Sequence, residues 1–335
     1  MIHIQSPTRV DLAGGTLDCW PLFLFAGEAS TVNLSIDIMT SAQLTPRDDN
    51  KVSVDISDLN WKAEFENVQA LIDDESPENL LVREVLRYHR PTKGFDLKTA
   101  SQSPVGGGLG GSSSLCISIL KAICELESWS WDTYEYVERA HNTEARILHG
   151  PTGTQDYVPA IIGGLNHIHY GTNGIKVRQL EMDEEYLNRK LSLVYTGKPH
   201  HSGINNWQVI KKAVEKDAET LTALKKIAEI SEKLVEVCES KNWDALPPLL
   251  NEESETRVML SKGFSSPEIE SLRTEAMGLG AEAVKICGAG GGGCVLIWGE
   301  PELHDKISKL CGKSALQHLQ VKVVPPLENA PAHKS

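Results

Sequence analysis

The feature that most constrains the fold is a glycine-rich segment at residues 104–114 (PVGGGLGGSSS), between an extended segment and an apolar helix. Five of the six residues from 106 to 111 are glycine, so the backbone can adopt positive φ and approach a ligand closely. A helix that begins at this loop adds unpaired N–H groups and the positive end of its dipole. Together these features predict an anion site suited to phosphates, where a serine hydroxyl can also ligate Mg²⁺. The segment lacks GK[ST] and the dinucleotide-binding fingerprint, so it is neither a Walker A loop nor a Rossmann turn.

Two further glycine segments lie near the ends of the chain, at residues 6–18 (SPTRVDLAGGTLD) and 285–294 (KICGAGGGGC). In the first, Arg9 offers five donors for a phosphate or a carboxylate, and Asp11 and Asp18 offer acceptors for sugar hydroxyls. A structural ion pair between Arg9 and Asp11 or another carboxylate explains the same pattern equally well. The segment at 285–294 is consistent with a hairpin loop or with backbone that passes close to an active site.

Glu144 and Asp156 are the acidic candidates. Glu144 lies on a predicted helix over 131–148, capped by Ser130 or Asp132, and Asp156 lies in the Pro/Gly-rich loop that follows. One carboxylate can hold Mg²⁺ and a second can accept the proton of an attacking hydroxyl. The spacing alone does not bring the two together, and each taken singly is typical of a solvated surface acid.

Strand-like segments come first and long helices later, which indicates an α+β fold rather than a doubly wound parallel sheet. The tail from Pro325 to Ser335 is rich in Pro and Ala and is expected to fray. The expected strands are 31–44, 52–56, 94–99, 161–170, 191–196 and 294–298. The expected helices are 114–126, 131–148, 204–239, a stretch to Leu260 after an interruption at Pro247-Pro248, and one from Pro267 to Gly278 or Gly280.

Length and charge set the broad class. A chain of 335 residues suggests two domains, and its 33 basic and 46 acidic residues give a net charge of −13. That balance argues against a broad nucleic-acid or anionic-membrane surface. No apolar run approaches a membrane span and the N-terminus does not resemble a signal peptide. The seven cysteines form no CxxC pair, which favours buried thiols in a reducing cytoplasm over a disulfide or zinc framework.

The three glycine segments, in this order, resemble the three motifs of the GHMP kinases, a family that includes galactokinase, homoserine kinase, mevalonate kinase and phosphomevalonate kinase. The likeness runs from residue 6 to about 298. Within the family the chain is most similar to the D-glycero-D-manno-heptose 7-phosphate kinases and the fucokinase-type sugar kinases. The matching pieces are 12–15 with Asp18, 108–113, 153–156, 163–164, 195–197 and 288–293.

The resemblance implies a two-lobed α+β fold, with an N-terminal S5-like lobe over residues 1–185, a ferredoxin-like lobe over 186–335, and ATP and Mg²⁺ in the cleft between them. Asp156 would be the catalytic acid-base, assisted by Arg9, and Ser112 and Glu144 would ligate Mg²⁺. The residues expected to hold the ATP phosphates are Pro104, Gly106, Gly107, Gly108, Leu109, Gly110, Gly111, Ser112 and Ser113. Those expected on the acceptor side are Gly15, Thr16, Asp18, Tyr195, His201, Gly288, Gly290 and Gly291.

The implied function is transfer of the ATP γ-phosphate to a hydroxyl of a sugar or sugar phosphate, in a cytoplasmic monomer or homodimer without nucleic-acid or membrane partners. Alternatives are a mevalonate-type or cyclitol kinase, and a non-catalytic nucleotide- or sugar-binding sensor, against which the presence of Glu144 and Asp156 argues. The chain reads AGGTLD over residues 13–18 where heptose kinases tend to read AGGGTD. His200 and His201 either bind a phosphate or an acidic substrate group in the acceptor pocket or are exposed loop residues. The acceptor therefore stays open at the level of sequence.

Overall fold

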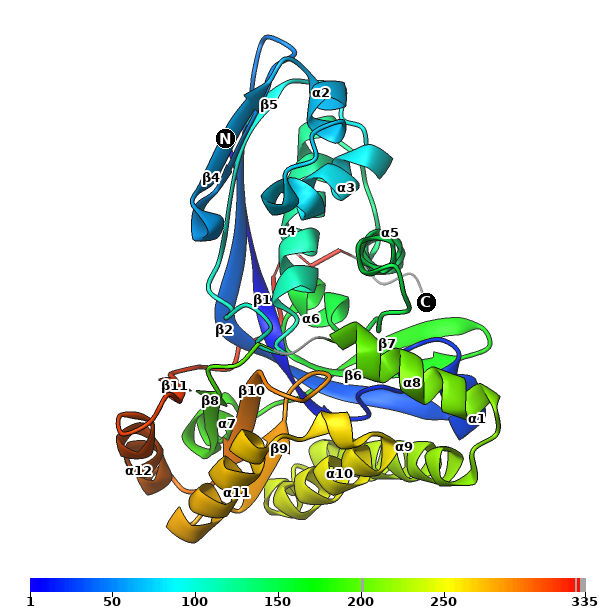
Figure 1. Ribbon diagram of the computed structural model, residues 1–335, viewed down its shortest axis with the longest axis vertical. Coiled ribbons are helices and arrows are strands. Elements are labelled where there is room, and N and C mark those ends of the chain that lie inside the picture. The colour runs from blue at the N-terminus through cyan, green and yellow to red at the C-terminus, as the bar shows by residue number, and fades with distance from the viewer. Residues whose placement is uncertain (200–201, 329, 332–335) are drawn as a thin grey trace.

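The chain forms two β-sheets with helices packed around them, and the predicted α+β class is confirmed (Figure 1). The computed structural model describes residues 1–199, 202–328 and 330–331, and the side chains of 202–205 lie outside that description. The seven-stranded sheet is built from the first half of the chain, and the four-stranded sheet comes from the second half.

Strand β2 is the spine of the larger sheet. It pairs with β1 along most of its length, while its two halves pair with β6 and β5, and the strand order is β4-β3-β5-β2-β6-β7. Neighbouring strands run antiparallel except β3 and β5, which are parallel. The strands are β1 (Ile2–Ala13), β2 (Ala29–Pro46), β3 (Val52–Ile56), β4 (Trp61–Phe65), β5 (Phe95–Ser101), β6 (Leu165–Gly171) and β7 (Gly174–Leu180).

Helix α4 lies against β1 and β2 and carries the predicted glycine loop at its N-terminal end. Its apolar side chains, such as Ile119 and Ile123, are buried in the core beneath the sheet. The predicted cap of α5 is confirmed, because Asp132 accepts from the backbone N–H of Glu135 in a capping box. The helices of this half are α1 (Leu22–Ala26), α2 (Val68–Ile72), α3 (Leu80–Tyr88), α4 (Gly111–Glu127), α5 (Thr133–Leu148) and α6 (Tyr157–Ile162).

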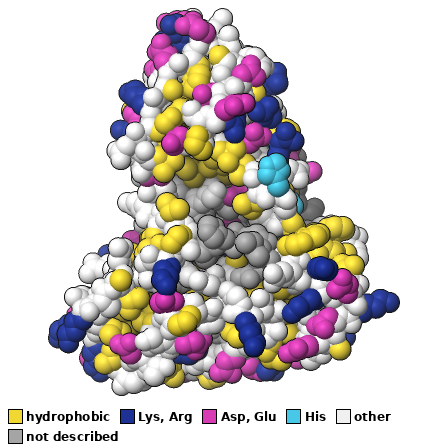
Figure 2. All heavy atoms as spheres, viewed as in Figure 1, with side chains coloured by type: hydrophobic (Ala, Val, Ile, Leu, Met, Phe, Trp, Pro, Cys, Tyr) yellow, Lys and Arg dark blue, Asp and Glu magenta, His cyan; other side chains and the backbone are white. Residues whose placement is uncertain are grey.

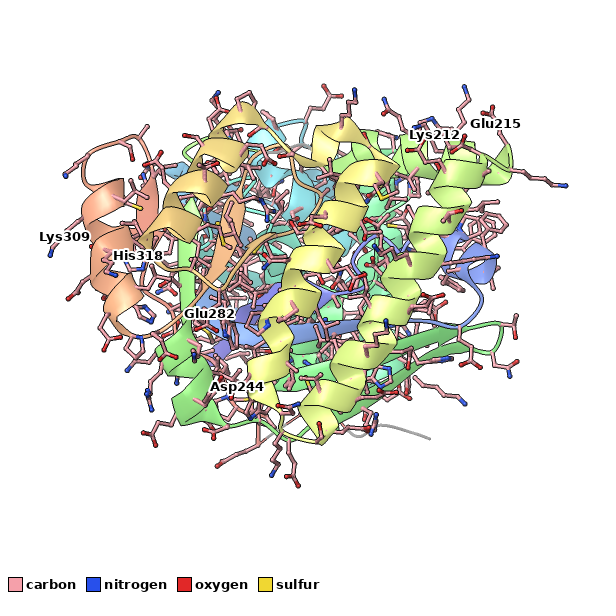
Figure 3. All side chains as sticks on the ribbon, turned by 90° about the horizontal axis from the view of Figure 1, so that it is seen from below. Lys212, Glu215, Asp244, Glu282, Lys309 and His318 are labelled. Carbon is pink, nitrogen blue, oxygen red and sulfur yellow. The ribbon has the colours of Figure 1, made fainter. Side chains whose placement is uncertain are left out.

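The smaller sheet is antiparallel, in the order β11-β8-β10-β9. Seen from below, helices α9 and α10 lie side by side (Figure 3); α9 packs against β2 of the larger sheet and α10 against β9 of the smaller one. The strands are β8 (Leu191–Tyr195), β9 (Ala283–Ile286), β10 (Cys294–Trp298) and β11 (Gln317–Leu319). The helices are α7 (Glu184–Lys190), α8 (Ser202–Val214), α9 (Ala218–Glu239), α10 (Leu246–Leu260), α11 (Pro267–Leu279) and α12 (Glu302–Cys311).

The two sheets share a hydrophobic core. Val10 and Leu34 of the larger sheet pack in one buried cluster with Leu193 and Trp298 of the smaller sheet and Leu250 of α10. The last strand of the first sheet ends at residue 180 and the first strand of the second begins at 191. One hydrophobic core therefore contains residues from both sides of residue 185. The division of the chain into domains at 1–185 and 186–335 stays a prediction.

Four predictions about elements are wrong. The predicted helix over 204–239 is two helices, α8 and α9, because the chain turns at Lys216 (φ +61°) and Asp217 caps the second helix. Residues 161–162 belong to α6 rather than a strand, because Gly163 and Gly164, both at positive φ, end the helix before β6 begins. The Pro247-Pro248 pair does not interrupt a helix but lies in the first turn of α10, where a missing N–H costs nothing. The tail from Pro325 does not fray over its described part: the Leu327 N–H donates to the Ile162 carbonyl, and Gly163 forms a β-bridge with Pro326.

Candidate functional site

A cavity of about 440 Å³ opens at the N-terminal end of α4. Its wall combines the glycine loop before α4, residues of β1 and the turn that follows, the loop before α6, and Arg257 of α10. In Figure 2, hydrophobic side chains gather around the upper rim of the hollow in the middle of the visible face. The cavity therefore draws on segments from both halves of the chain.

The three glycine segments are in direct contact at this cavity. The Arg9 N–H donates to the Leu109 carbonyl (3.1 Å), and the Cys294 N–H donates to the Gly107 carbonyl (2.7 Å). A Cβ on Gly288, at φ +64°, would lie 2.7 Å from Gly108 Cα, so only glycine allows these two backbones to pack so closely. The first and third segments therefore fix the loop at 106–110 from two sides.

The start of α4 faces the cavity with backbone N–H groups. Gly110, at φ +70°, precedes the helix, and residues 110–113 all line the cavity. The first N–H groups of a helix have no partner within it, and the helix dipole adds a partial positive charge at the same place. This arrangement fits the phosphates of a nucleotide.

Arg9 and Asp156 form an ion pair on the cavity wall. Arg9 Nε and Nη2 lie 2.8 and 2.6 Å from Asp156 Oδ1, and Nη1 donates to the Gly108 carbonyl (2.6 Å). Burial disfavours the guanidinium charge, but Asp156 and Asp11 hold the pKa of Arg9 above its ordinary value. The side chain of Asp156 keeps 24% of its surface exposed and packs against Gly110 at the start of α4. A carboxylate placed in this way can accept a proton beside a bound phosphate.

Glu144 lies on the same wall and is buried. Ser113 Oγ donates to its Oε2 (2.6 Å), so α5 and α4 are joined at the cavity. Burial raises the pKa of the Glu144 carboxyl, and hydrogen bonds from Ser113, Tyr157 and Ser112 offset part of that shift. Among the described residues no three His, Cys, Asp or Glu side chains form a group that could hold a metal alone. Mg²⁺ that is shared with nucleotide phosphates needs only one or two protein ligands, and Glu144 with the exposed Ser112 fits that role.

Asp18 lies at the end of the turn after β1 and also lines the cavity. The Gln155 N–H donates to its Oδ2 (3.2 Å), which joins the turn to the loop that carries Asp156. Burial and the charge of Asp156 raise the pKa of Asp18 to about 6. Asp18 is thus a buried acceptor for hydroxyl groups next to the Arg9–Asp156 pair.

Asp11, in contrast, does not line the cavity. It belongs to a buried cluster of four charges, defined by Asp11 of β1, Glu253 and Arg257 of α10, and Lys285 of β9. Arg257 Nη1 lies 3.1 Å from Asp11 Oδ2, and Lys285 Nζ lies 3.0 Å from Glu253 Oε2. Sequence reasoning missed Arg257, although the charged Lys285 inside an apolar strand was a signal that buried partners exist.

The part of the cavity on the side of β3 and α3 is mostly apolar, although Asp58 and Glu78 also line it, and it was not predicted. Its side chains are too dispersed along the chain to form a pattern in the sequence. The apolar residues there are Ile56, Leu59, Leu81, Val82, Leu115 and Leu148. A flat aromatic base fits this kind of lining.

Most of the predicted site residues line the cavity, and five do not. Leu109 is buried in the shared core, and Tyr195 lies on β8, where its hydroxyl donates to the Val105 carbonyl (3.4 Å). Gly290 and Gly291 lie against the backbone of Phe264 and Gly263, and Gly15 lies against Asp11. His201 lies outside the described residues. The predicted residues that line the cavity are Arg9, Thr16, Asp18, Pro104, Gly106, Gly107, Gly108, Gly110, Gly111, Ser112, Ser113, Glu144, Asp156 and Gly288.

Comparison with known proteins gives the same picture. A family model described as GHMP kinases N terminal domain matches residues 79–164, and one described as GHMP kinases C terminal matches 221–312. D-glycero-alpha-D-manno-heptose 7-phosphate kinase of Campylobacter jejuni is 27% identical over 307 residues, which cover 90% of each chain. Mevalonate kinase of Pyrococcus furiosus is 27% identical over 210 residues, which cover 60% of this chain and 59% of that one.

A similar fold occurs among solved structures. A D-glycero-D-manno-heptose 1-phosphate kinase from Bacteriodes thetaiotaomicron superposes with a TM-score of 0.77 at 20% identity, over 97% of each chain. Within the part of the chain that the structure describes, no helix is both long and apolar enough to cross a membrane.

Proposed function

We propose that this chain, which belongs to the GHMP kinase family and is an ATP-dependent phosphotransferase acting on a hydroxyl group, uses a sugar or sugar phosphate as its acceptor. The observation that carries the proposal is the position of Asp18, a buried carboxylate that lines the cavity beside Asp156. A buried carboxylate that accepts hydroxyl donors suits a polyhydroxylated ligand. The heptose 7-phosphate kinase relative, similar along 90% of both chains, supports the same acceptor class.

ATP would lie with its phosphates on the N–H groups of residues 106–113 and its base in the apolar part of the cavity. Glu144 and Ser112 would hold Mg²⁺, and the ion would supply charge neutralisation at the phosphates. Ser113 orients Glu144 by its hydrogen bond to Oε2.

Asp156 would orient the acceptor hydroxyl and accept its proton as the oxygen attacks the γ-phosphorus. Arg9 fixes the Asp156 carboxylate and places a permanent positive charge beside the transferred group. Phosphoryl transfer needs mainly positioning and charge neutralisation, and these residues supply both. Thr16 and Gly288, which line the same cavity, complete the acceptor side of the proposed site.

The mevalonate kinases among the relatives make a mevalonate-type or cyclitol kinase the second candidate. They are similar over 60% to 84% of this chain. Asp18 with its neighbouring polar groups suits a polyhydroxylated ligand better than mevalonate, which carries few hydroxyls. A non-catalytic sensor is disfavoured, since a binding protein has no need of both Glu144 and Asp156.

The test is an ADP-release assay with ATP and Mg²⁺ over heptose phosphates, free heptoses, hexoses, cyclitols and mevalonate. We expect turnover with a sugar or sugar phosphate and a loss of about 10²–10⁴-fold in kcat for Asp156→Asn. Calorimetry should show that the variant still binds ATP. Turnover of mevalonate alone, or full activity of the Asp156→Asn variant, would contradict the acceptor class or the assigned base respectively.

A further inference from the structure

The turn from Gly14 to Asp18 rests directly on the Asp11–Arg257 ion pair. Arg257 Nη1 donates to Asp11 Oδ2 and its Nη2 donates to Thr16 Oγ1, both at 3.1 Å. A Cβ on Gly15 would overlap Asp11 Oδ2 and lie 3.0 Å from Arg257 Nη1. The turn backbone therefore sits on the ion pair with no room for a side chain between them.

Thr16 is held in a conformation that its residue type rarely adopts. Its φ is +82°, in the left-handed region that is unfavourable for β-branched residues. Such a residue persists only where its surroundings fix it, and strained residues of this kind concentrate at ligand sites. The hydroxyl of Thr16 accepts from Arg257, so that guanidinium is placed to hold the strained residue.

The charge of Arg257 is already balanced. Asp11 and Glu253 face Arg257 and Lys285 in the buried four-charge cluster, which therefore has no net charge when all four groups are ionised. Although Arg257 lines the cavity, it is not a free cation for a substrate anion. Its fork of donors, shared between Asp11 and Thr16, is suited to fixing geometry.

We propose that Arg257 is a positioning residue for the acceptor, which acts through Thr16 and Asp11 to fix the 14–18 turn so that Asp18 faces the transferred group. The proposal rests on the assignment of Asp18 to the acceptor in the proposed function. Arg257 comes from α10, more than 200 residues along the chain from the turn, so the second half of the chain would set acceptor affinity in the first.

Steady-state kinetics of Arg257→Lys, Thr16→Val and the double variant test this role. The lysine ammonium can still pair with Asp11 but cannot donate to Asp11 and Thr16 at the same time, as the guanidinium does. Valine has the shape of threonine but lacks the oxygen that accepts from Arg257. We expect each single variant to raise the acceptor KM about tenfold, with the ATP KM within twofold of wild type. The double variant should have the same acceptor KM as the single variants, because the two substitutions remove the same hydrogen bond. Arg273→Lys, which breaks a comparable bond to Ser254 on α10 away from the cavity, is the matched control and should leave both KM values unchanged.

Amide hydrogen exchange gives a second readout that needs no substrate. The Leu17 and Cys19 N–H groups bond to Gly14 and Thr16 carbonyls within the turn, and their exchange should accelerate in both single variants but not in Arg273→Lys. If Arg257→Lys folds poorly, Thr16→Val tests the same hydrogen bond from the other side.

Unchanged exchange together with an unchanged acceptor KM would overturn the proposal. So would strictly additive effects in the double variant, since these would mean that Arg257 and Thr16 contact the acceptor independently. A wild-type enzyme without turnover of any sugar would overturn the proposed function instead, and faster exchange at the turn would still support the positioning contact.

Discussion

Arg9 and Asp156 are 147 residues apart in the sequence, and in the structure Arg9 Nε and Nη2 both lie within 2.8 Å of one oxygen, Asp156 Oδ1. The same guanidinium donates to the Gly108 carbonyl, so it also holds the loop before α4. One side chain thus connects the carboxylate that would take the proton to the loop that would hold the phosphates.

We expect Arg9→Lys to lower kcat by about 10–100-fold, because an ammonium cannot reproduce the fork that contacts Asp156 and Gly108 together. Because lysine retains the positive charge, a lower kcat would show that the hydrogen-bond geometry of Arg9 matters and not only its charge. Steady-state kinetics with saturating ATP and acceptor measure it, and circular dichroism checks that the fold is intact. Wild-type kcat in this variant would contradict the role given to the pair.

Asp18 predicts a pH dependence of acceptor binding. Its pKa is raised to about 6, chiefly by burial, so the carboxylate that accepts sugar hydroxyls is lost as pH falls through that value. The acceptor KM should therefore rise below about pH 6, while the ATP KM changes less. Asp18→Asn should show a high acceptor KM at every pH, and a wild-type KM that stays flat from pH 5 to 8 would contradict the prediction.

The same shift affects stability with a defined sign. The folded state binds a proton on Asp18 more tightly than the unfolded chain, whose aspartate titrates near 3.8. The stabilisation from this group is therefore full below about pH 4 and lost as pH rises through about 6, by up to about 3 kcal/mol. Since asparagine mimics the protonated form, Asp18→Asn should gain stability relative to wild type as pH rises from 4 to 7. Denaturant melts at several pH values measure the difference.

The sequence predicted the elements whose patterns are local. The glycine loop, the apolar helix after it, and the Asp132 cap of α5 all follow from residues within one or two turns of each other. The buried four-charge cluster could not be predicted, because Asp11 and Arg257 are joined only by the tertiary fold. Neither could the apolar half of the cavity, since its side chains come from separate elements with no common spacing.

The contact between Gly288 and Gly108 predicts a clash for any side chain. In Gly288→Ala the Cβ would meet Gly108 Cα at 2.7 Å, in addition to the strain of φ +64°. We expect a loss of about 2–4 kcal/mol in the free energy of unfolding and an increase of about tenfold in the ATP KM, because the loop at 106–110 must shift. Gly174→Ala is the matched control: its φ is +97° but nothing lies within 4 Å of the added Cβ, so only the strain of about 1 kcal/mol applies. Equal effects of the two substitutions would contradict the packing argument.

Glu144→Gln separates metal binding from structure. The amide oxygen can still accept from Ser113, but a neutral ligand binds Mg²⁺ less well, so the Mg²⁺ concentration for half-maximal rate should rise about tenfold or more. Burial disfavours the charged form of this carboxyl, as its raised pKa shows. A neutral glutamine at this position should therefore not lower the melting temperature of the protein measured without metal. Chelation of the metal should abolish wild-type turnover. An unchanged Mg²⁺ requirement in the variant would assign Glu144 a structural role only.

The C-terminal tail predicts a coupling between stability and catalysis. Within residues 321–335, the Val324 N–H donates to the Ser35 carbonyl and the Lys322 carbonyl accepts from the Asp37 N–H, both on β2. The Leu327 N–H donates to the Ile162 carbonyl at the end of α6, the helix that begins directly after Asp156. Deletion of residues 321–335 should lower the free energy of unfolding by about 3 kcal/mol or more, because several buried hydrogen bonds are lost at about 0.5–1.5 kcal/mol each. It should also lower kcat, since α6 loses a contact at one end while Asp156 sits at the other. Deletion of 329–335 keeps these bonds and is the control. If the two truncated proteins have the same free energy of unfolding and the same kcat, residues 321–328 neither stabilise the fold nor help to position Asp156.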